Sequence, residues 1–129
     1  MRKAVLFSSV LLMAPPNSVL AQQTASHQQT SAPVNSRYEI VQSGIAARYT
    51  YRVDKRCGNV AQLVTSASGD FVWEEMLVVG LPACSNSSSA RYQLFTSGIA
   101  ARVTILIDTA TGRSWFAAND GDLSYWAPF

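Results

Sequence analysis

Histidine is almost absent from this chain of 129 residues, and the single copy is His27. His27 lies within QQTASHQQTSAPVNS, a stretch at residues 22–36 with almost no large apolar side chain. Such a stretch cannot offset the entropy of ordering, so we expect a disordered leader. Catalysis by a nucleophile and a neighbouring base usually needs a folded histidine. We therefore expect no catalytic site, no metal centre, no cofactor and no enzymatic activity.

An excess of positive charge is also missing once the first residues are set aside. The formal net charge of +2 comes from Arg2 and Lys3, because the eight basic and eight acidic residues after them cancel. Nucleic-acid binding normally leaves a surplus of Lys and Arg. The composition therefore argues against a nucleic-acid partner.

Long hydrophobic runs are confined to the N-terminus. Arg2 and Lys3 precede a mainly apolar segment at residues 4–14, and the tripeptide VLA at residues 19–21 suits a signal peptidase. This layout predicts a secretory signal peptide at residues 1–21. The apolar segment is too short to cross about 30 Å of hydrocarbon, so we expect no membrane span in the mature chain. The predicted location is periplasmic or extracellular.

Cysteine is scarce, with Cys57 and Cys84 as the only pair. In an exported protein such a pair predicts one disulfide, and the alternative of a reactive or metal-binding thiol pair lacks a nearby histidine. The disulfide would contribute on the order of 3 kcal/mol in the chain-entropy model. A single small domain at residues 37–129 would benefit from it.

The sequence that remains is internally duplicated. Residues 37–58 align without a gap to residues 91–112 at an offset of 54, and both segments contain the hexapeptide SGIAAR. Arg37/Arg91 and Asp54/Asp108 also coincide, and GDFVW (69–73) matches GDLSY (121–125) after a two-residue slip. We therefore divide the domain into two repeats, at residues 37–80 and 91–129, joined by a linker at residues 81–90.

Each repeat has the alternating pattern of antiparallel strands. We predict strands near residues 37–43, 47–54, 59–65 and 71–79, and their counterparts in the second repeat. The alternation assigns one buried face to Ala47, Tyr49, Tyr51 and Val53, and the matching face to Ala101, Val103, Ile105 and Ile107. The predicted fold class is all-β, with two pseudo-symmetric meanders of three to four strands packed as a small sandwich or barrel.

The connections carry turn residues. DKRCG (54–58) and DTATG (108–112) predict type I turns that end in a glycine with positive φ. For the first hairpin we predict a four-residue loop at residues 44–47, which places Glu39 opposite Arg52 and keeps this acidic side chain off the apolar face.

Two interpretations of SGIAAR remain open. It is either a hairpin scaffold, in which glycine reverses the chain and arginine caps strand-end carbonyls, or a pair of loops that contacts a partner. Its candidate binding residues are Ser43, Gly44, Arg48, Ser97, Gly98 and Arg102. Trp115 and Trp126 are candidates for stacking on a sugar, with core packing as the alternative. We interpret Glu74, Glu75 and the NDGD segment (119–122) as solvated or turn residues.

Two short segments resemble known families. DTATGRSW (108–115) resembles the D-x-x-T-G-x-x-W hairpin in blades of quinoprotein-like β-propellers, which implies a blade-like meander, since two units cannot close a propeller. SGIAARY (43–49) is similar to the S-G-x-x-Y loop of periplasmic lysozyme inhibitors, small disulfide-bearing barrels that plug an enzyme cleft. The whole chain looks most like small exported bacterial two-repeat β proteins.

The function predicted from these observations is binding. We expect an exported module that contacts a protein partner in the bacterial cell envelope or outside the cell. The alternatives are a glycan or peptidoglycan ligand held by exposed aromatics, and inhibition of an envelope-directed hydrolase.

Overall fold

The structure is a computed structural model that describes residues 32–86, 88–100, 103–121 and 123–129. The described residues form eight β-strands, four in each repeat. These strands are β1 (Tyr38–Gln42), β2 (Thr50–Asp54), β3 (Val60–Thr65), β4 (Phe71–Val78), β5 (Tyr92–Thr96), β6 (Thr104–Asp108), β7 (Ser114–Asp120) and β8 (Leu123–Pro128). The predicted all-β class is confirmed. Within the described ranges, no helix is long and apolar enough to cross a membrane.

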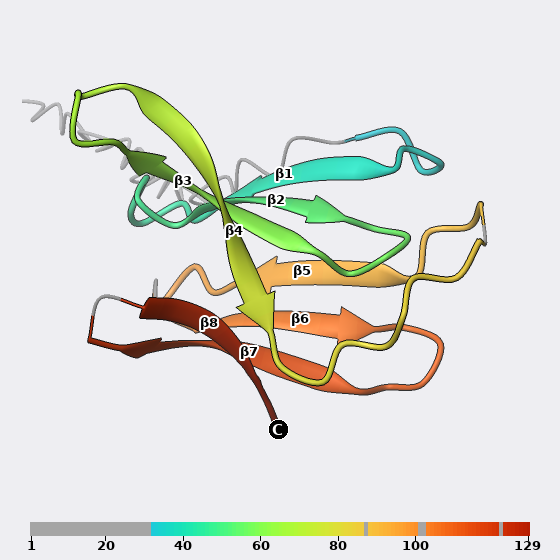
Figure 1. Cartoon of the computed structure of the whole chain (residues 1–129). Coiled ribbons are helices and arrows are strands. Elements are labelled where there is room, and N and C mark those ends of the chain that lie inside the picture. Colours follow the sequence, from blue (N-terminus) through green and yellow to red (C-terminus); the bar gives the residue numbers. More distant parts are fainter. Residues whose placement is uncertain (1–31, 87, 101–102, 122) are drawn as a thin grey trace, which may run out of the picture.

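The strands form one sheet that rolls up until it nearly closes into a barrel (Figure 1). Their order is β1-β2-β3-β4-β8-β7-β6-β5, so each repeat is an antiparallel meander and the two repeats join at β4 and β8. This junction is the parallel pair of the sheet. The edge strand β5 contacts both β1 and β2, which brings the two edges of the sheet together.

The turns after β2 and β6 each end in the glycine with positive φ that the sequence predicts. Gly58 and Gly112 have φ values of 81° and 77°, and each donates its N–H to the carbonyl of the aspartate that opens the turn, at 2.8 Å. The Asp54 and Asp108 carboxylates also accept backbone N–H groups within their own turns. These aspartates and glycines therefore repeat in the sequence because the turn needs them.

The predicted register of the first hairpin is wrong by one residue. Glu39 lies opposite Val53, not opposite Arg52, and the N–H of Ser43 donates to the carbonyl of Tyr49 at 3.0 Å. Residues 44–48 therefore form a five-residue loop. Glu39 is tolerated on the inward side because Lys55 lies 3.8 Å from its carboxylate. Arg52 pairs instead with Glu75 at 2.8 Å.

The predicted buried face is correct for Tyr51 and Val53 of the first repeat, and it is wrong for the exposed Ala47 and for the residues described in the second repeat. Tyr51 and Val53 are buried, while Ala47 and Tyr49 lie in the loop before β2. In β6 the buried residues are Thr104, Leu106 and Asp108, and the predicted core residues Ile105 and Ile107 lie on the outer face, partly exposed. Val103 is exposed as well, and Ala101 lies outside the described residues.

The parallel junction between the repeats explains this inversion. Because β4 and β8 run in the same direction, every strand of the first repeat runs parallel to its counterpart in the second. A rotation that superposes the repeats must therefore have its axis along the strands, and such a rotation exchanges the two faces of the sheet. Successive side chains point to opposite faces, and both repeats share one interior. Equivalent residues therefore point inward in one repeat and outward in the other.

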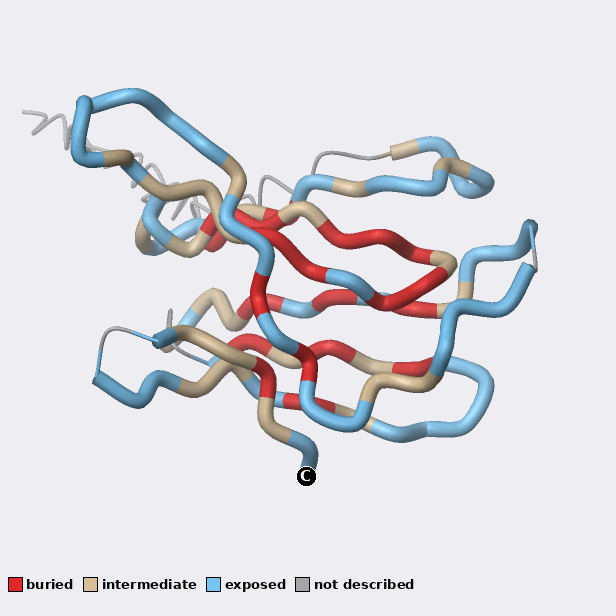
Figure 2. Tube along the Cα trace, viewed as in Figure 1, coloured by how far each residue is buried: buried red, intermediate tan, exposed pale blue. Residues whose placement is uncertain are grey.

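Buried residues lie along strands of both repeats (Figure 2), and their aliphatic and aromatic side chains form one core. The ring of Tyr51 meets the ring of Trp126 edge to face, with centroids 5.7 Å apart. Burial raises the pKa of Tyr51 to about 12, and its hydroxyl shares a hydrogen bond with Thr104 of the other repeat. The core is thus common to both repeats, so neither repeat buries its apolar face alone.

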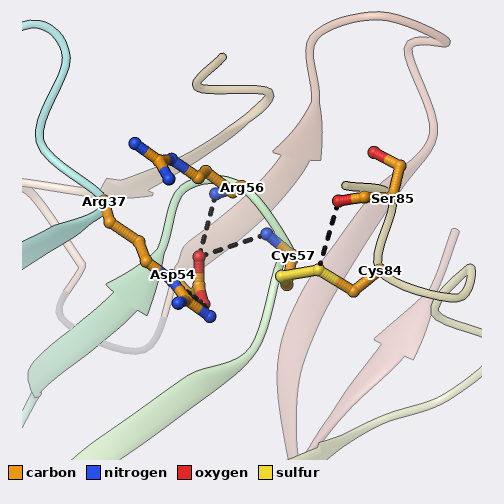
Figure 3. Close-up of a disulfide and its surroundings, with 6 residues drawn as sticks. All are labelled: Arg37, Asp54, Arg56, Cys57, Cys84 and Ser85. Atoms are coloured by element: carbon orange, nitrogen blue, oxygen red, sulfur yellow. Dashed lines mark hydrogen bonds and ion pairs between the residues drawn. A yellow bond between two sulfur atoms is a disulfide. The ribbon is translucent and has the colours of Figure 1, made fainter. Parts of the chain in front are cut away.

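Cys57 and Cys84 form the predicted disulfide (Figure 3). It ties the turn after β2 to the linker between the repeats. Figure 3 also shows the Asp54 carboxylate, which accepts the N–H groups of Arg56 and Cys57 at 3.0 and 3.2 Å. The disulfide therefore anchors the linker to a turn that already has its own hydrogen bonds.

Candidate functional site

Both SGIAAR segments lie at the same end of the barrel. Since β1 and β5 run in the same direction, the loops that follow them project from one end, together with the β3–β4 and β7–β8 connections (Figure 1). We call this surface the loop end and define it by the described residues within 43–49, 66–71, 97–100 and 121–123. Both copies of SGIAAR therefore contribute to one surface.

The serines of the two hexapeptides fix the loop backbone. The Ser43 hydroxyl accepts the N–H of Ile45 at 3.3 Å, and the Ser97 hydroxyl accepts the N–H of Ile99 at 3.1 Å. Such side-chain-to-backbone bonds stabilise tight turns. The serines therefore have a structural role in both repeats, as the scaffold interpretation predicts.

The backbone conformation of Gly44 does not require a glycine. Its φ is not positive, and a Cβ added there would meet nothing within 4 Å. Glycine is selected where the backbone needs positive φ or where another molecule approaches closely. Neither backbone conformation nor packing within this chain therefore explains the glycine at position 44. Gly98 is half-buried at the matching position.

Arg48 is exposed and lies against its own neighbour. Its guanidinium donates from Nη2 to the Tyr49 hydroxyl at 3.0 Å and covers the Tyr49 ring at 4.8 Å from the centroid. The bond that the structure shows thus goes to a side chain, and not to a strand-end carbonyl as the scaffold interpretation expects. Arg102, its counterpart, lies outside the described residues.

The most informative residues of the loop end were missed by the sequence reasoning. Ile45 and Ile99 are 51% and 96% exposed, and Phe71 and Leu123 are 76% and 58% exposed. They form two pairs of equivalent positions, one in SGIAAR and one at the start of β4 and β8. Core packing cannot explain why exposed positions stay apolar in both repeats. The signal was in the aligned repeats, but the interpretation concentrated on the arginines.

Polar residues of the loop end belong to its turns. The Asp70 carboxylate accepts the hydroxyl of Ser68 at 2.8 Å, and the Asp70 N–H donates to the hydroxyl of Ser66 at 3.1 Å. In the β7–β8 connection the Ser124 hydroxyl donates to Oδ1 of Asn119 at 2.7 Å. These bonds are typical of turns and agree with the interpretation of NDGD as a turn segment, although Asp122 of that segment lies outside the described residues. Among the described residues, no group of three or more His, Cys, Asp or Glu side chains could hold a metal ion.

The opposite end of the barrel holds a pair of matching ion pairs that the sequence reasoning also missed. Arg91 donates from Nε and Nη2 to the two oxygens of the buried Asp108, at 2.7 and 2.6 Å. These bonds hold the pKa of Asp108 well below its ordinary value. Arg37 contacts a single oxygen of Asp54, with Nε and Nη2 at 3.0 and 2.9 Å from Oδ2. The hydrogen bond to the aspartate raises the pKa of each arginine. Their repetition indicates a structural role in joining the residue before β1 or β5 to the turn that follows β2 or β6.

A small polar hollow lies beside the first of these ion pairs. It measures about 200 Å³ and is lined by Arg37, Tyr38, Arg52, Asp54, Asn59 and Glu75. The Arg52 guanidinium lies between the Tyr38 and Trp73 rings, 6.0 and 5.1 Å from their centroids. Two arginines and two carboxylates balance each other here, and each arginine has an acidic partner. The hollow therefore has no charge to offer to a ligand, and we favour the loop end.

Trp115 and Trp126 lie inside the barrel and are both 0% exposed. The Trp115 indole donates from Nε1 to the carbonyl of Val79 at 2.8 Å. This placement supports the core-packing alternative, because neither ring offers a face to a sugar. Glu74 and Glu75 are exposed, as the solvated interpretation predicts.

No protein-family model matches the chain, and neither a curated protein nor a solved structure shows significant similarity to it.

Proposed function

We propose that the protein is an exported binding module whose loop end contacts a protein partner. The observation that carries this proposal is the exposure of four large apolar side chains at two pairs of equivalent positions, Ile45/Ile99 and Phe71/Leu123. Packing in the hydrophobic core cannot account for apolar side chains at exposed positions in both repeats, whereas a contact surface can. The proposed module is a binder without enzymatic activity of its own.

The chemistry of the loop end suits a protein surface. Burying an aliphatic or aromatic side chain of this size contributes about 1.5–3 kcal/mol, and protein interfaces gather such side chains at their centre. Gly44 leaves room for a partner's backbone to approach. Arg48 is exposed in the same loop as Ile45 and would offer donors to a partner's carbonyl or carboxylate.

Export is supported by two independent features. The N-terminal segment has the order of a signal peptide, and Cys57 is bonded to Cys84. Disulfides persist in the periplasm and outside the cell and are rare in the cytosol. The loop end would therefore meet envelope or extracellular proteins.

The test is partner capture from an extract of the cell envelope, followed by affinity measurement with the purified partner. The double variant Ile45→Ser with Ile99→Ser should weaken binding at least about tenfold, because two apolar contacts worth together more than roughly 1.4 kcal/mol disappear. Its melting temperature should stay unchanged, since both side chains are exposed. A second variant, Arg48→Ala with Arg102→Ala, should also reduce capture without a change in melting temperature.

The matched control is Val34→Ser. Val34 is 86% exposed, and it lies near Lys55 at the opposite end of the barrel. This variant removes a comparable exposed aliphatic side chain and should bind like the unmodified protein. Equal affinity of the isoleucine variant and the control would refute a role for the loop end. If the isoleucine or arginine variant loses stability while its folded fraction still binds, SGIAAR is scaffold.

A further inference from the structure

The outer wall of the second repeat is an apolar sheet face. The strand register places Phe95 opposite Ile105, Ile105 opposite Phe116, and Phe116 opposite Ala127. One row of apolar side chains therefore crosses β5, β6, β7 and β8 on the same side. This side is the outer one, because the inward neighbours Leu94, Leu106, Trp115 and Trp126 are all buried in the core.

This apolar wall is accessible. Phe95, Phe116 and Phe129 are 56%, 41% and 79% exposed, and the last two rings lie against each other with centroids 5.4 Å apart. Ile105 and Ile107 lie on the same wall and are partly exposed. The alternating sequence pattern of this strand predicts that these two isoleucines are buried. The face inversion between the repeats has turned a strand pattern typical of a core toward the outside.

Charge distinguishes this wall from the corresponding wall of the first repeat. Among the described residues that point outward from β5 to β8, Asp120 is the charged one, and it lies at the loop end of β7. The outer wall of the first repeat instead carries Arg52 paired with Glu75, beside Arg37 paired with Asp54. The two walls therefore suit different surroundings, and the second suits an uncharged apolar surface.

We propose that a second copy of this chain covers the outer wall of the second repeat, so that the protein is a symmetric dimer. A surface without charge is complementary to itself under a twofold rotation, and homodimer interfaces are the more apolar class. Residues 22–31 of the polar leader, QQTASHQQTS, contain no large apolar side chain with which to cover this wall. The dimer would leave the loop end free, so this inference is independent of the proposed function.

The area of the wall fits a small dimer interface. With roughly 200 Å² per phenylalanine, the exposed parts of Phe95, Phe116 and Phe129 amount to about 350 Å². The isoleucines and the flanking strand residues raise this to about 500 Å² for each copy, near the upper range for an apolar patch on a monomer. Two copies would bury about 1,000 Å², the lower limit for a specific interface. We therefore expect a dissociation constant that is roughly micromolar.

The experiment is sedimentation velocity over a concentration series with the exported chain, whose N-terminus is read from its intact mass. The unmodified protein should change from monomer to dimer as its concentration rises. Phe116→Lys and Phe95→Lys, made separately, should each raise the dissociation constant at least tenfold, because lysine places like charges at the twofold interface. Two variants are used so that a folding defect in one leaves the other informative.

The control is Phe71→Lys, which adds the same charge to an exposed phenylalanine at the loop end. Its dissociation constant should match that of the unmodified chain. A protein that is monomeric at every concentration overturns the proposal, whatever else covers the wall. A dimer that persists in both wall variants, or that is lost equally in Phe71→Lys, also overturns it.

Discussion

The inversion of faces between the repeats can be tested with two neighbouring residues of β6. Leu106 points into the barrel and Ile107 points outward, although sequence alternation assigns Ile107 to the core. Truncation of each side chain to alanine removes a similar number of carbon atoms. The two substitutions therefore compare the two faces of one strand with the chemistry held nearly constant.

The structure predicts a large difference between these substitutions. Leu106 is 0% exposed, and Leu-to-Ala changes at such sites lower the free energy of unfolding by about 2–5 kcal/mol, through lost burial and a residual cavity. Ile107 is partly exposed and leaves no closed cavity, so its truncation should lower that free energy by about 1 kcal/mol or less. In a domain of this size the difference corresponds to a gap of more than about 5 °C in melting temperature.

The measurement is urea unfolding followed by far-ultraviolet circular dichroism, at a protein concentration low enough for the monomer to dominate. Both variants should keep the slope of the unmodified protein, so that the transition midpoint reports stability directly. If Ile107→Ala destabilises the protein as much as Leu106→Ala, or more, the core follows the sequence alternation and the inverted-face argument fails.

Two further predictions concern the opposite end of the barrel. Asp108→Asn should lower the free energy of unfolding by about 2 kcal/mol near neutral pH, because an uncharged amide replaces the buried carboxylate that accepts two hydrogen bonds from Arg91. Since the folded-state pKa of Asp108 is below its unfolded value near 3.9, this contribution is present above about pH 4 and is lost as the pH falls below it. Acid titration of stability should therefore be less steep in the variant, and equal slopes would contradict the buried ion pair. Replacement of Cys57 and Cys84 by alanine should lower the free energy of unfolding by about 3 kcal/mol, and an unchanged urea midpoint would contradict the disulfide's role.

Local sequence signals predicted the strands and the glycine-ended turns after β2 and β6. The turns at Asp54–Gly58 and Asp108–Gly112 depend on a side-chain acceptor and on glycine at positive φ, which residue identity alone indicates. The hairpin register was one residue off, because excluding Glu39 from the inward side ignored Lys55, a residue that is distant from Glu39 in the sequence but lies beside it in the barrel. The same limit applies to the ion pair between Arg91 and Asp108: the repeat marks both residues, but only the fold shows that they meet.

The sequence predicted which loops form the candidate site but did not identify their exposed apolar residues. The duplication indicated that SGIAAR occurs at two equivalent loops, and the structure places both loops at one end. Arg48 and Arg102 were predicted as binding residues because a charged side chain can form ion pairs and hydrogen bonds with a partner. The exposed isoleucines at 45 and 99 were not recognised, since an apolar residue in a sequence is assigned to the core until its exposure is known.

The sequence by itself determined the all-β class, the duplication, the turn chemistry and the cysteine pair, because each depends on short-range backbone geometry or on residue identity. Only the tertiary structure decided which face of each strand is buried. Alternation divides Ile105 from Leu106 but does not say which side points inward. The parallel pairing of β4 with β8 requires this choice to be opposite in the two repeats, and packing of the shared core decides which repeat takes which face. The same pairing brings both copies of SGIAAR to one end of the barrel and turns the apolar wall of the second repeat outward.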